Sequence, residues 1–180
     1  NRVAMTMPLW DCRESEIAAL MTLRIAGSVH AMPPGESCVS SASNMLGMMI
    51  GVNSGSTKVD ELLNTKTIVL WGANVCDLYP PYSRWLEMAR EKGVKIVYLD
   101  PRRTRTSLLA DMQLRPLPGT DGVLAIGAIR YMLETGAYDE ERARFQIEGF
   151  DELAVETESF TVEKVASATG LSPEAITAFY

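Results

Sequence analysis

The sequence is poor in residues that bind metals or form disulfide frameworks. It contains three cysteines, Cys12, Cys38 and Cys76, without a Cys-x-x-Cys pair, and one histidine, His30. An odd number of widely spaced cysteines is a poor disulfide framework, and with a single histidine these residues do not form a zinc or iron–sulfur site. The composition therefore argues against small disulfide-rich and zinc-binding classes of protein.

Long apolar runs and an excess of positive charge are also missing. No apolar run approaches the roughly 20 residues that a membrane-spanning helix needs. The formal net charge is −6, which argues against nucleic acid as a partner, because such binding relies on Lys and Arg that neutralise phosphates. With 180 residues, 47% of them hydrophobic, the chain can form one globular domain, or a domain with a small appendage.

Three apolar, strand-like runs dominate the middle of the chain, and each is followed by polar residues and a helical pattern. The expected strands are Thr67–Trp71, Val94–Leu99 and 111–117, and the helical patterns are 83–92, 104–110 and 121–135. This alternation predicts an α/β fold, a doubly wound and mostly parallel, Rossmann-like sheet. Ligands of such sheets bind at the carboxyl ends of the strands. We therefore expect an extended, phosphate-bearing ligand at that edge.

Helical patterns also flank the predicted sheet. They cover residues 15–25, 39–50 and 57–63 before it, and residues 139–145, 150–157, 162–169 and 173–180 after it. We divide the chain into an α/β domain, residues 1–136, and a C-terminal helical appendage, residues 137–180. The last helix stops without a cap, so we expect the chain to be a fragment of a larger polypeptide.

The first polar segment is Gly72-Ala-Asn74, directly after a predicted strand. Glycine lets the backbone approach a ligand closely, and asparagine offers both a donor and an acceptor. By itself the segment also fits an ordinary turn from strand to helix. Its spacing differs from the Gly-x-Gly-x-x-Gly fingerprint, which argues against a plain nicotinamide-binding domain.

The second polar segment begins with Asp100-Pro-Arg102 and continues to Arg103 and Arg105. An acidic residue after the second strand is where a ribose hydroxyl is usually accepted. Arg102 can bind a phosphate with two parallel hydrogen bonds. The alternative is a solvated cluster of charges, which the position after a buried strand disfavours.

The third polar segment, Gly119-Thr-Asp121, begins the long predicted helix. Thr120 or Asp121 could simply be the N-cap of that helix. The functional alternative is that Asp121 binds guanine, because a carboxylate only accepts hydrogen bonds and the N1–H and 2-amino groups of guanine only donate them.

Together these segments resemble the motifs of the molybdopterin oxidoreductases of the dimethyl sulfoxide reductase family, with a small insertion in the third motif, Arg115-Pro-Leu-Pro-Gly-Thr-Asp. The likeness covers about residues 15–180. It implies a bis(molybdopterin guanine dinucleotide) cofactor with molybdenum or tungsten. The residues that it places at the cofactor are Gly72, Asn74, Asp77, Asp100, Arg102, Thr104, Gly119 and Asp121.

The same resemblance implies that Cys38 is the catalytic residue that ligates the metal. Its spacing to Asn74 matches the cysteine or selenocysteine ligand of formate dehydrogenases, and Gly35-Glu-Ser-Cys38 matches the ligand loop of the sulfoxide reductases. Thiolates are soft ligands that suit such centres. The alternative for Cys38 is a small buried apolar residue, the commonest role of a free cysteine.

Val39 follows Cys38, where formate dehydrogenases have a histidine that handles the substrate's proton. The resemblance therefore favours a reductase of S-oxides, N-oxides or oxyanions, of the dimethyl sulfoxide, nitrate or thiosulfate type and typical of anaerobic respiration. The alternatives are a formate dehydrogenase-like enzyme, a non-redox hydratase of the same family, and a free-standing nucleotide-binding α/β module.

The family's N-terminal iron–sulfur cysteines and the domain that holds the second pterin are not found in this sequence. We therefore expect an iron–sulfur cluster in an N-terminal part outside the sequence, and no catalysis from the 180 residues alone. The resemblance further implies a small oxidised substrate, iron–sulfur and membrane-anchor partner subunits, and a prokaryotic periplasmic or cytoplasmic location.

Overall fold

The computed structural model describes residues 5–6, 13–28, 31–32, 39–52 and 58–180. The chain divides into two compact units, residues 1–57 and residues 58–180, and we describe each by itself. In the described part of the chain, every helix is too short or too polar to cross a membrane.

The first unit contains two helices and two short strands. Its elements are β1 (Met5–Thr6), α1 (Arg13–Ile25), β2 (Ala31–Met32) and α2 (Val39–Ile50), and the two strands pair in parallel. Both helices were predicted, and α2 has the predicted bounds. The strands were not predicted, because two residues are too few to show an alternating pattern. The predicted metal ligand Cys38 lies outside the described residues.

The second unit is built on a three-stranded parallel sheet. Its strands β3 (Thr67–Trp71), β4 (Lys95–Leu99) and β5 (Met112–Leu114) lie side by side in chain order. The sheet confirms the predicted α/β class. The third strand is shorter than predicted, and Pro116 lacks the N–H that a longer pairing needs.

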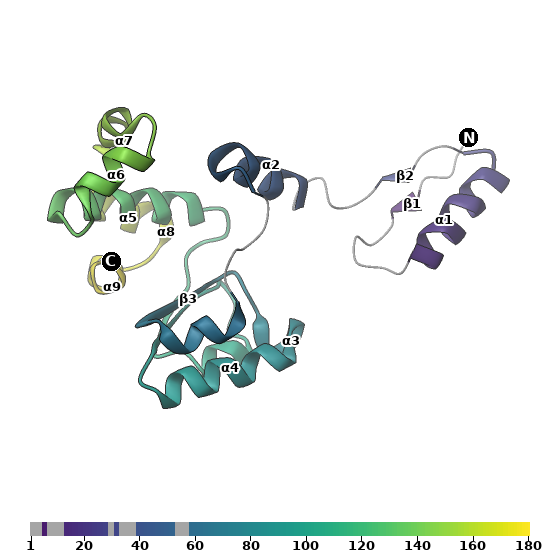
Figure 1. Cartoon of the computed structure of the whole chain (residues 1–180), viewed down its shortest axis with the longest axis horizontal. Coiled ribbons are helices and arrows are strands. Elements are labelled where there is room, and N and C mark those ends of the chain that lie inside the picture. The colour runs from purple at the N-terminus through teal and green to yellow at the C-terminus, as the bar shows by residue number, and fades with distance from the viewer. Residues whose placement is uncertain (1–4, 7–12, 29–30, 33–38, 53–57) are drawn as a thin grey trace. The chain divides into compact units, whose positions relative to one another are not determined.

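Helices form most of the remainder of this unit (Figure 1). They are η2 (Val59–Asn64), α3 (Val75–Leu78), α4 (Pro80–Glu91), η3 (Arg105–Leu108), α5 (Asp121–Thr135), α6 (Glu140–Gln146), α7 (Phe150–Thr157), α8 (Val162–Thr169) and α9 (Pro173–Phe179). The predicted start of α4 was three residues late, because Pro80 and Pro81 occupy the first turn, where no N–H partner is needed. Helix α3 was not predicted.

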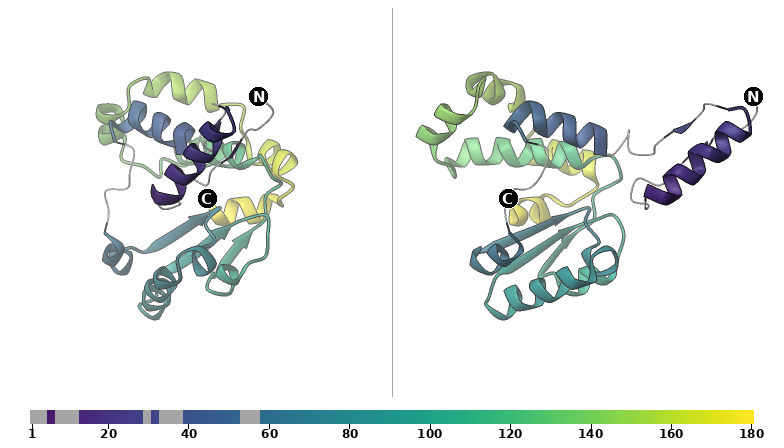
Figure 2. Two further views of the ribbon diagram at one scale, coloured as in Figure 1. Left: turned by 90° about the vertical axis from the view of Figure 1, so that its right-hand side faces the viewer. Right: turned by 45° about the vertical axis from the view of Figure 1, so that its right-hand side comes forward.

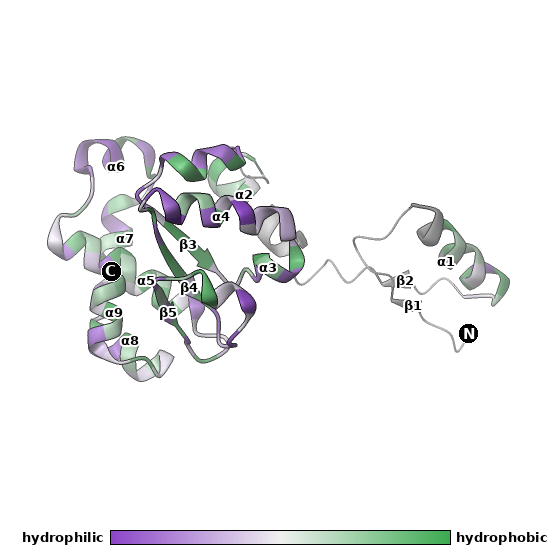
Figure 3. Cartoon of the chain, turned by 90° about the horizontal axis from the view of Figure 1, so that it is seen from below, coloured by the Kyte–Doolittle hydropathy of each residue, from purple (hydrophilic) through white to green (hydrophobic). Residues whose placement is uncertain are grey.

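Successive residues of β4 point to opposite faces of the sheet and into two different cores. Ile96 and Tyr98, both fully buried, pack with Leu86 and Ala89 of α4 on one face. On the other face Leu99 packs with apolar residues of α5, α8 and α9. Figure 2 shows helices on both faces of the sheet, and Figure 3 shows the apolar strands between them. The carboxyl ends of the strands remain as a polar edge between the two cores.

The last two helices, α8 and α9, share the second core with the sheet. Val165 of α8 and Ile176 of α9 are fully buried there. Thr161 and Ser172 cap these helices through their side chains, and Gly170 ends α8 in a left-handed conformation. Helices α8 and α9 therefore pack on the sheet, while the division of the chain into a domain and an appendage at residue 136 stays a prediction.

At Gly127, helix α5 comes close to side chains of the C-terminal segment. A Cβ atom there would contact the Tyr180 hydroxyl and would lie 2.6 Å from a methyl carbon of Val165. Because these neighbours lie in a packed core, Gly127→Ala should lower the free energy of unfolding by about 1–3 kcal/mol, measured by urea unfolding.

Gly122 in the same helix is the matched control, because a Cβ there has no described atom within 4 Å. Gly122→Ala should be neutral, or stabilising by up to about 1 kcal/mol through the higher helix propensity of alanine. Equal effects of the two substitutions would contradict close packing at Gly127.

Candidate functional site

The polar segments predicted from the sequence meet at the carboxyl ends of the three strands. Gly72 follows β3 with φ of 62°, and its N–H donates to the carbonyl of Leu99 at 2.7 Å. The left-handed backbone is one that glycine adopts without strain, and a Cβ at Gly72 would meet only open space. Backbone is therefore accessible to a ligand where β3 ends.

Asn74 joins the loop after β3 to the loop after β4. Its side-chain amide donates to Asp77 at 2.8 Å, and its oxygen accepts from the hydroxyl of Thr106 at 2.9 Å. Thr106 is fully buried and also accepts from the backbone N–H of Cys76 at 3.1 Å. Arg105 lies 3.8 Å from the Asp77 carboxylate. Two loops about thirty residues apart in the chain are thus held as one surface.

Asp100 ends the central strand and is only 3% exposed. One of its oxygens accepts from the backbone N–H of Arg102 at 2.8 Å and from Nε of the same residue at 3.3 Å. The other accepts from the Tyr98 hydroxyl at 3.0 Å and faces Nη2 of Arg102 at 3.5 Å. The Tyr98 hydroxyl in turn contacts that of Thr104 at 2.9 Å. The carboxylate is thus fully surrounded by donors.

These contacts determine the charge of Asp100. Burial by itself raises the pKa of Asp100, but the hydrogen bonds from Arg102 and Tyr98 outweigh burial and hold the pKa below its usual value. Burial raises the pKa of Tyr98, so its hydroxyl stays protonated as a donor. Asp100 therefore remains an anion over the ordinary pH range and orients the Arg102 cation.

The arginines of this edge differ in how firmly they are held. Arg102 is 68% exposed although it pairs with Asp100, so part of its guanidinium faces solvent. Gln113 donates to the carbonyl of Arg102 at 3.1 Å, and Arg115 donates to that of Pro101 at 3.1 Å. Arg103 is exposed, and its side chain forms no ion pair with any described residue. Arg102 is thus the oriented cation of this group.

Asp121 is the first residue of α5, and Gly119 precedes it with φ of 83°. Thr120 occupies the predicted N-cap position, but its side chain accepts no hydrogen bond from the helix N–H groups. Its hydroxyl instead donates to the carbonyl of Leu117 at 2.6 Å. One carboxylate oxygen of Asp121 accepts from the indole N–H of Trp71 at 2.8 Å. Asp121 thereby lies close to the end of β3.

Sequence reasoning missed the residues that support this site. Tyr98 and Trp71 were counted as apolar strand residues and Thr106 as part of the helical pattern over 104–110, yet all three hydrogen-bond predicted site residues. The sequence offered one signal for these residues, namely that each side chain carries a hydroxyl or an indole N–H. Such a group needs a hydrogen-bond partner when it is buried. The partners of Trp71 and Thr106 lie in distant segments that the linear sequence does not pair, whereas Asp100 is only two residues from Tyr98.

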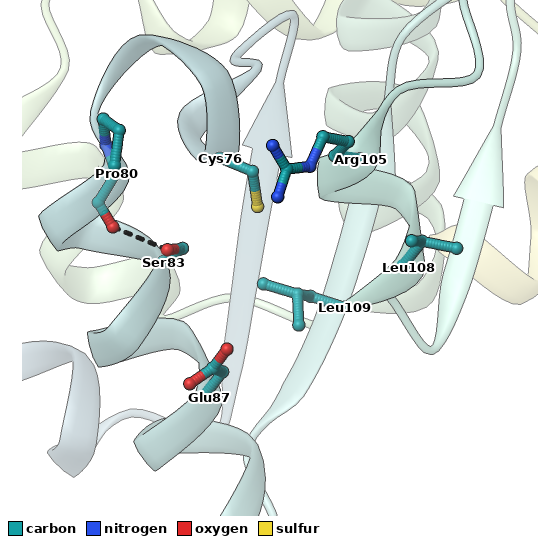
Figure 4. Close-up of a pocket in the computed structure, with 7 residues that line it drawn as sticks. All are labelled: Cys76, Pro80, Ser83, Glu87, Arg105, Leu108 and Leu109. Atoms are coloured by element: carbon teal, nitrogen blue, oxygen red, sulfur yellow. Dashed lines mark hydrogen bonds between the residues drawn. The ribbon is translucent and has the colours of Figure 1, made fainter.

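A cavity of about 360 Å³ lies beside this edge, between α4 and η3 (Figure 4). Cys76, Ser83, Glu87, Arg105 and Leu109 are among its lining residues. Within the described ranges, no three His, Cys, Asp or Glu side chains gather closely enough to hold a metal ion. The second unit by itself therefore presents a polar, cationic edge suited to an anionic organic ligand.

Comparison with known proteins gives the class to which this fold and edge belong. The family described as Molybdopterin oxidoreductase matches residues 5–176. The chain belongs to this family.

Individual relatives agree with the family. The chain is 30% identical over 139 residues to the assimilatory nitrate reductase catalytic subunit of Bacillus subtilis, covering 77% of the chain and 20% of that protein. It is 30% identical over 131 residues to the F420-dependent formate dehydrogenase 2 subunit alpha of Methanococcus maripaludis, covering 73% of the chain and 19% of that protein. The chain thus spans about a fifth of the length of these relatives.

A solved structure confirms the fold. The acetylene hydratase from Pelobacter acetylenicus superposes with a TM-score of 0.73 at 24% identity, over 90% of this chain and 22% of that one. The family implies a molybdenum or tungsten pterin cofactor, and the described residues fit such a group. The fit rests on the accessible backbone at Gly72, where a Cβ would meet open space, and on the exposed, oriented guanidinium of Arg102.

The lowered pKa of Asp100 predicts an acid sensitivity of this edge. A carboxylate with a depressed folded-state pKa stabilises the protein above its unfolded-state pKa, and this contribution is lost as the pH falls through the folded-state value. Asp100→Asn should therefore lower the thermal unfolding midpoint at pH 7 and flatten its decline below about pH 5.

The exposed Glu148 provides the control, because Glu148→Gln should keep the wild-type pH profile. Thermal unfolding between neutral and acidic pH measures both variants. A decline in Asp100→Asn as steep as that of the wild type would show that the acid response arises elsewhere.

Proposed function

We propose that this chain is a cofactor-binding part of the catalytic subunit of a molybdenum or tungsten bis(molybdopterin guanine dinucleotide) oxidoreductase. The observation that carries the proposal is the buried Asp100 carboxylate, which holds Arg102 at the carboxyl edge of a parallel sheet with part of its guanidinium exposed. A fixed, partly exposed guanidinium binds phosphate oxygens with little loss of side-chain entropy. Family membership supports the pterin nature of the ligand.

Each motif has a distinct role in this proposal. Arg102 binds a phosphate, the backbone after Gly72 approaches the ligand, and Asp121 accepts from guanine. Since hydrogen bonds from Arg102 and Tyr98 already surround both oxygens of Asp100, we propose that Asp100 acts chiefly by orienting Arg102, and its role as ribose acceptor stays a prediction. Asn74, Asp77 and Thr104 keep the neighbouring loops in place through their hydrogen bonds.

The bound cofactor supplies a metal centre for oxygen-atom transfer with a small oxidised substrate. We favour reduction of an S-oxide, N-oxide or oxyanion, supported by the similarity to a nitrate reductase and by Val39 after Cys38. A formate dehydrogenase is the second candidate, supported by the similarity to formate dehydrogenase subunits. Viologen-coupled assays of the full-length protein with nitrate, dimethyl sulfoxide and formate separate the two. Iron–sulfur and membrane-anchor partner subunits remain part of the proposal.

Arg102→Ala tests the proposed phosphate contact in the full-length protein. Loss of a charge-assisted hydrogen bond weakens binding by about 1.5–3 kcal/mol, or about tenfold or more. The variant should therefore retain less pterin and metal after dialysis, as measured by pterin fluorescence and metal analysis. Arg102→Lys should lie between alanine and the wild type, because lysine keeps the charge but not the paired geometry.

Arg103→Ala is the matched control, because Arg103 adjoins Arg102 and is exposed. Its pterin content should equal that of the wild type. If Arg102→Ala keeps full pterin content, or if both variants lose it equally, a specific phosphate contact at Arg102 is wrong.

The proposed metal ligand Cys38 is tested in the same full-length protein. Cys38→Ser should change the electronic spectrum of the metal and the activity while pterin content stays unchanged, because the pterin dithiolenes still hold the metal. Cys76→Ser is the control and should leave the spectrum unchanged. A wild-type spectrum in Cys38→Ser would assign Cys38 to a packing role.

A further inference from the structure

Trp71 and Asp121 form a hydrogen bond between two segments that are fifty residues apart in the chain. The indole Nε1 donates to Oδ1 of Asp121 at 2.8 Å. Trp71 is the last residue of β3 and Asp121 is the first residue of α5. The order of the sheet is β3, β4, β5, so the bond connects the end of an edge strand to the helix that follows the opposite edge strand.

A carboxylate at the start of a helix has a competing set of donors. The first N–H groups of a helix lack partners within it, and an acidic side chain there commonly turns back to accept from them. In this structure Asp121 accepts instead from Trp71. The hydrogen bond from the indole thus fixes the orientation of the carboxylate.

The indole is itself fixed by the C-terminal helix. Its ring packs edge to face against Phe179, with the ring centroids 6.0 Å apart. The hydroxyl of Tyr180, the next residue, donates to the carbonyl of Leu124 in α5 at 2.8 Å. Helix α9 therefore connects Trp71 to the same helix that Asp121 begins, and the donor and the acceptor are both anchored to α5.

We propose that Trp71 is the positioning residue that gives this edge its selectivity for guanine. The inference rests on the proposed function, in which Asp121 reads the base. A carboxylate has about four acceptor positions, and the indole occupies one of them. The remaining positions can accept the N1–H and the 2-amino group of guanine, and the fixed orientation spares the free energy of ordering the side chain on binding.

The test uses the full-length protein prepared without its cofactor and titrated with GDP, IDP and ADP in a calorimeter. IDP lacks only the 2-amino group, so the ratio of its dissociation constant to that of GDP reports the contact with that group. The wild type should prefer GDP to IDP by about tenfold. Trp71→Phe removes the N–H donor but keeps an aromatic ring beside Phe179, and it should reduce this preference to about threefold or less.

Two further variants separate positioning from packing and from base recognition. Phe179→Leu keeps the indole donor and should retain more of the GDP preference than Trp71→Phe, although both alter the same ring contact. Asp121→Asn should abolish the preference, because its amide presents donors to the donors of guanine. ADP affinity should be the same in all variants.

The outcomes distinguish this inference from the proposed function. If Asp121→Asn abolishes the preference while Trp71→Phe keeps it at the wild-type value, positioning by Trp71 is overturned and base recognition stands. If Asp121→Asn also keeps the preference, the proposed guanine contact itself fails.

A second measurement covers the case in which Trp71→Phe does not fold. Full-length protein labelled with 5-fluorotryptophan gives one fluorine resonance for each tryptophan. The Trp71 resonance is assigned by replacing the other tryptophans with Phe one at a time, beginning with Trp10 and Trp85 of this sequence. The Trp71 resonance should shift when GDP saturates the protein and should shift less with IDP. An unchanged Trp71 resonance with GDP would overturn the inference.

Discussion

Asp100 carries a negative charge at the end of the central strand, where the side chain is almost completely buried. Moving a charge out of water is costly unless hydrogen bonds and an opposite charge compensate it. Arg102 and Tyr98 provide that compensation, and Thr104 fixes the Tyr98 hydroxyl. The requirement to satisfy this one carboxylate therefore determines the course of the loop after β4 and the position of its cation.

The loops on either side are organised around the same edge. Thr106, fully buried, connects the loop after β4 to Asn74 after β3, and Trp71 connects β3 to the start of α5. Three segments that are distant in sequence thus become neighbours through polar contacts between side chains. Because most of these contacts join side chains rather than backbone atoms, single substitutions can alter one loop without removing the sheet.

The two apolar cores hold this edge in place from opposite faces. Residues of β4 alternate between a core shared with α4 and a core shared with α5, α8 and α9. The polar side chains at the strand ends therefore lie on loops, yet they are positioned by the sheet and helices beneath those loops. Family membership and the similarity to an acetylene hydratase structure are consistent with this fold.

The sequence by itself determined most of the elements and their order. Apolar runs with period-two or helical spacing predicted β3, α2, α5, α7 and α8 with their observed bounds. An element that buries one face has apolar residues at regular intervals in the sequence, and these intervals identify it. Proline and capping signals were weaker guides, as the late predicted start of α4 shows. The motif residues at the strand ends were also visible, since each directly follows an apolar run.

Only the tertiary structure decided which of these side chains are paired. Asn74 with Thr106 and Trp71 with Asp121 are contacts that depend on strand order and on loops packing together. A sequence records the donors and acceptors, but the partner of each is set by folding, because hydrogen bonds need atoms about 3 Å apart. That is why Asp121, which read equally well as a helix cap, became the partner of an indole fifty residues away.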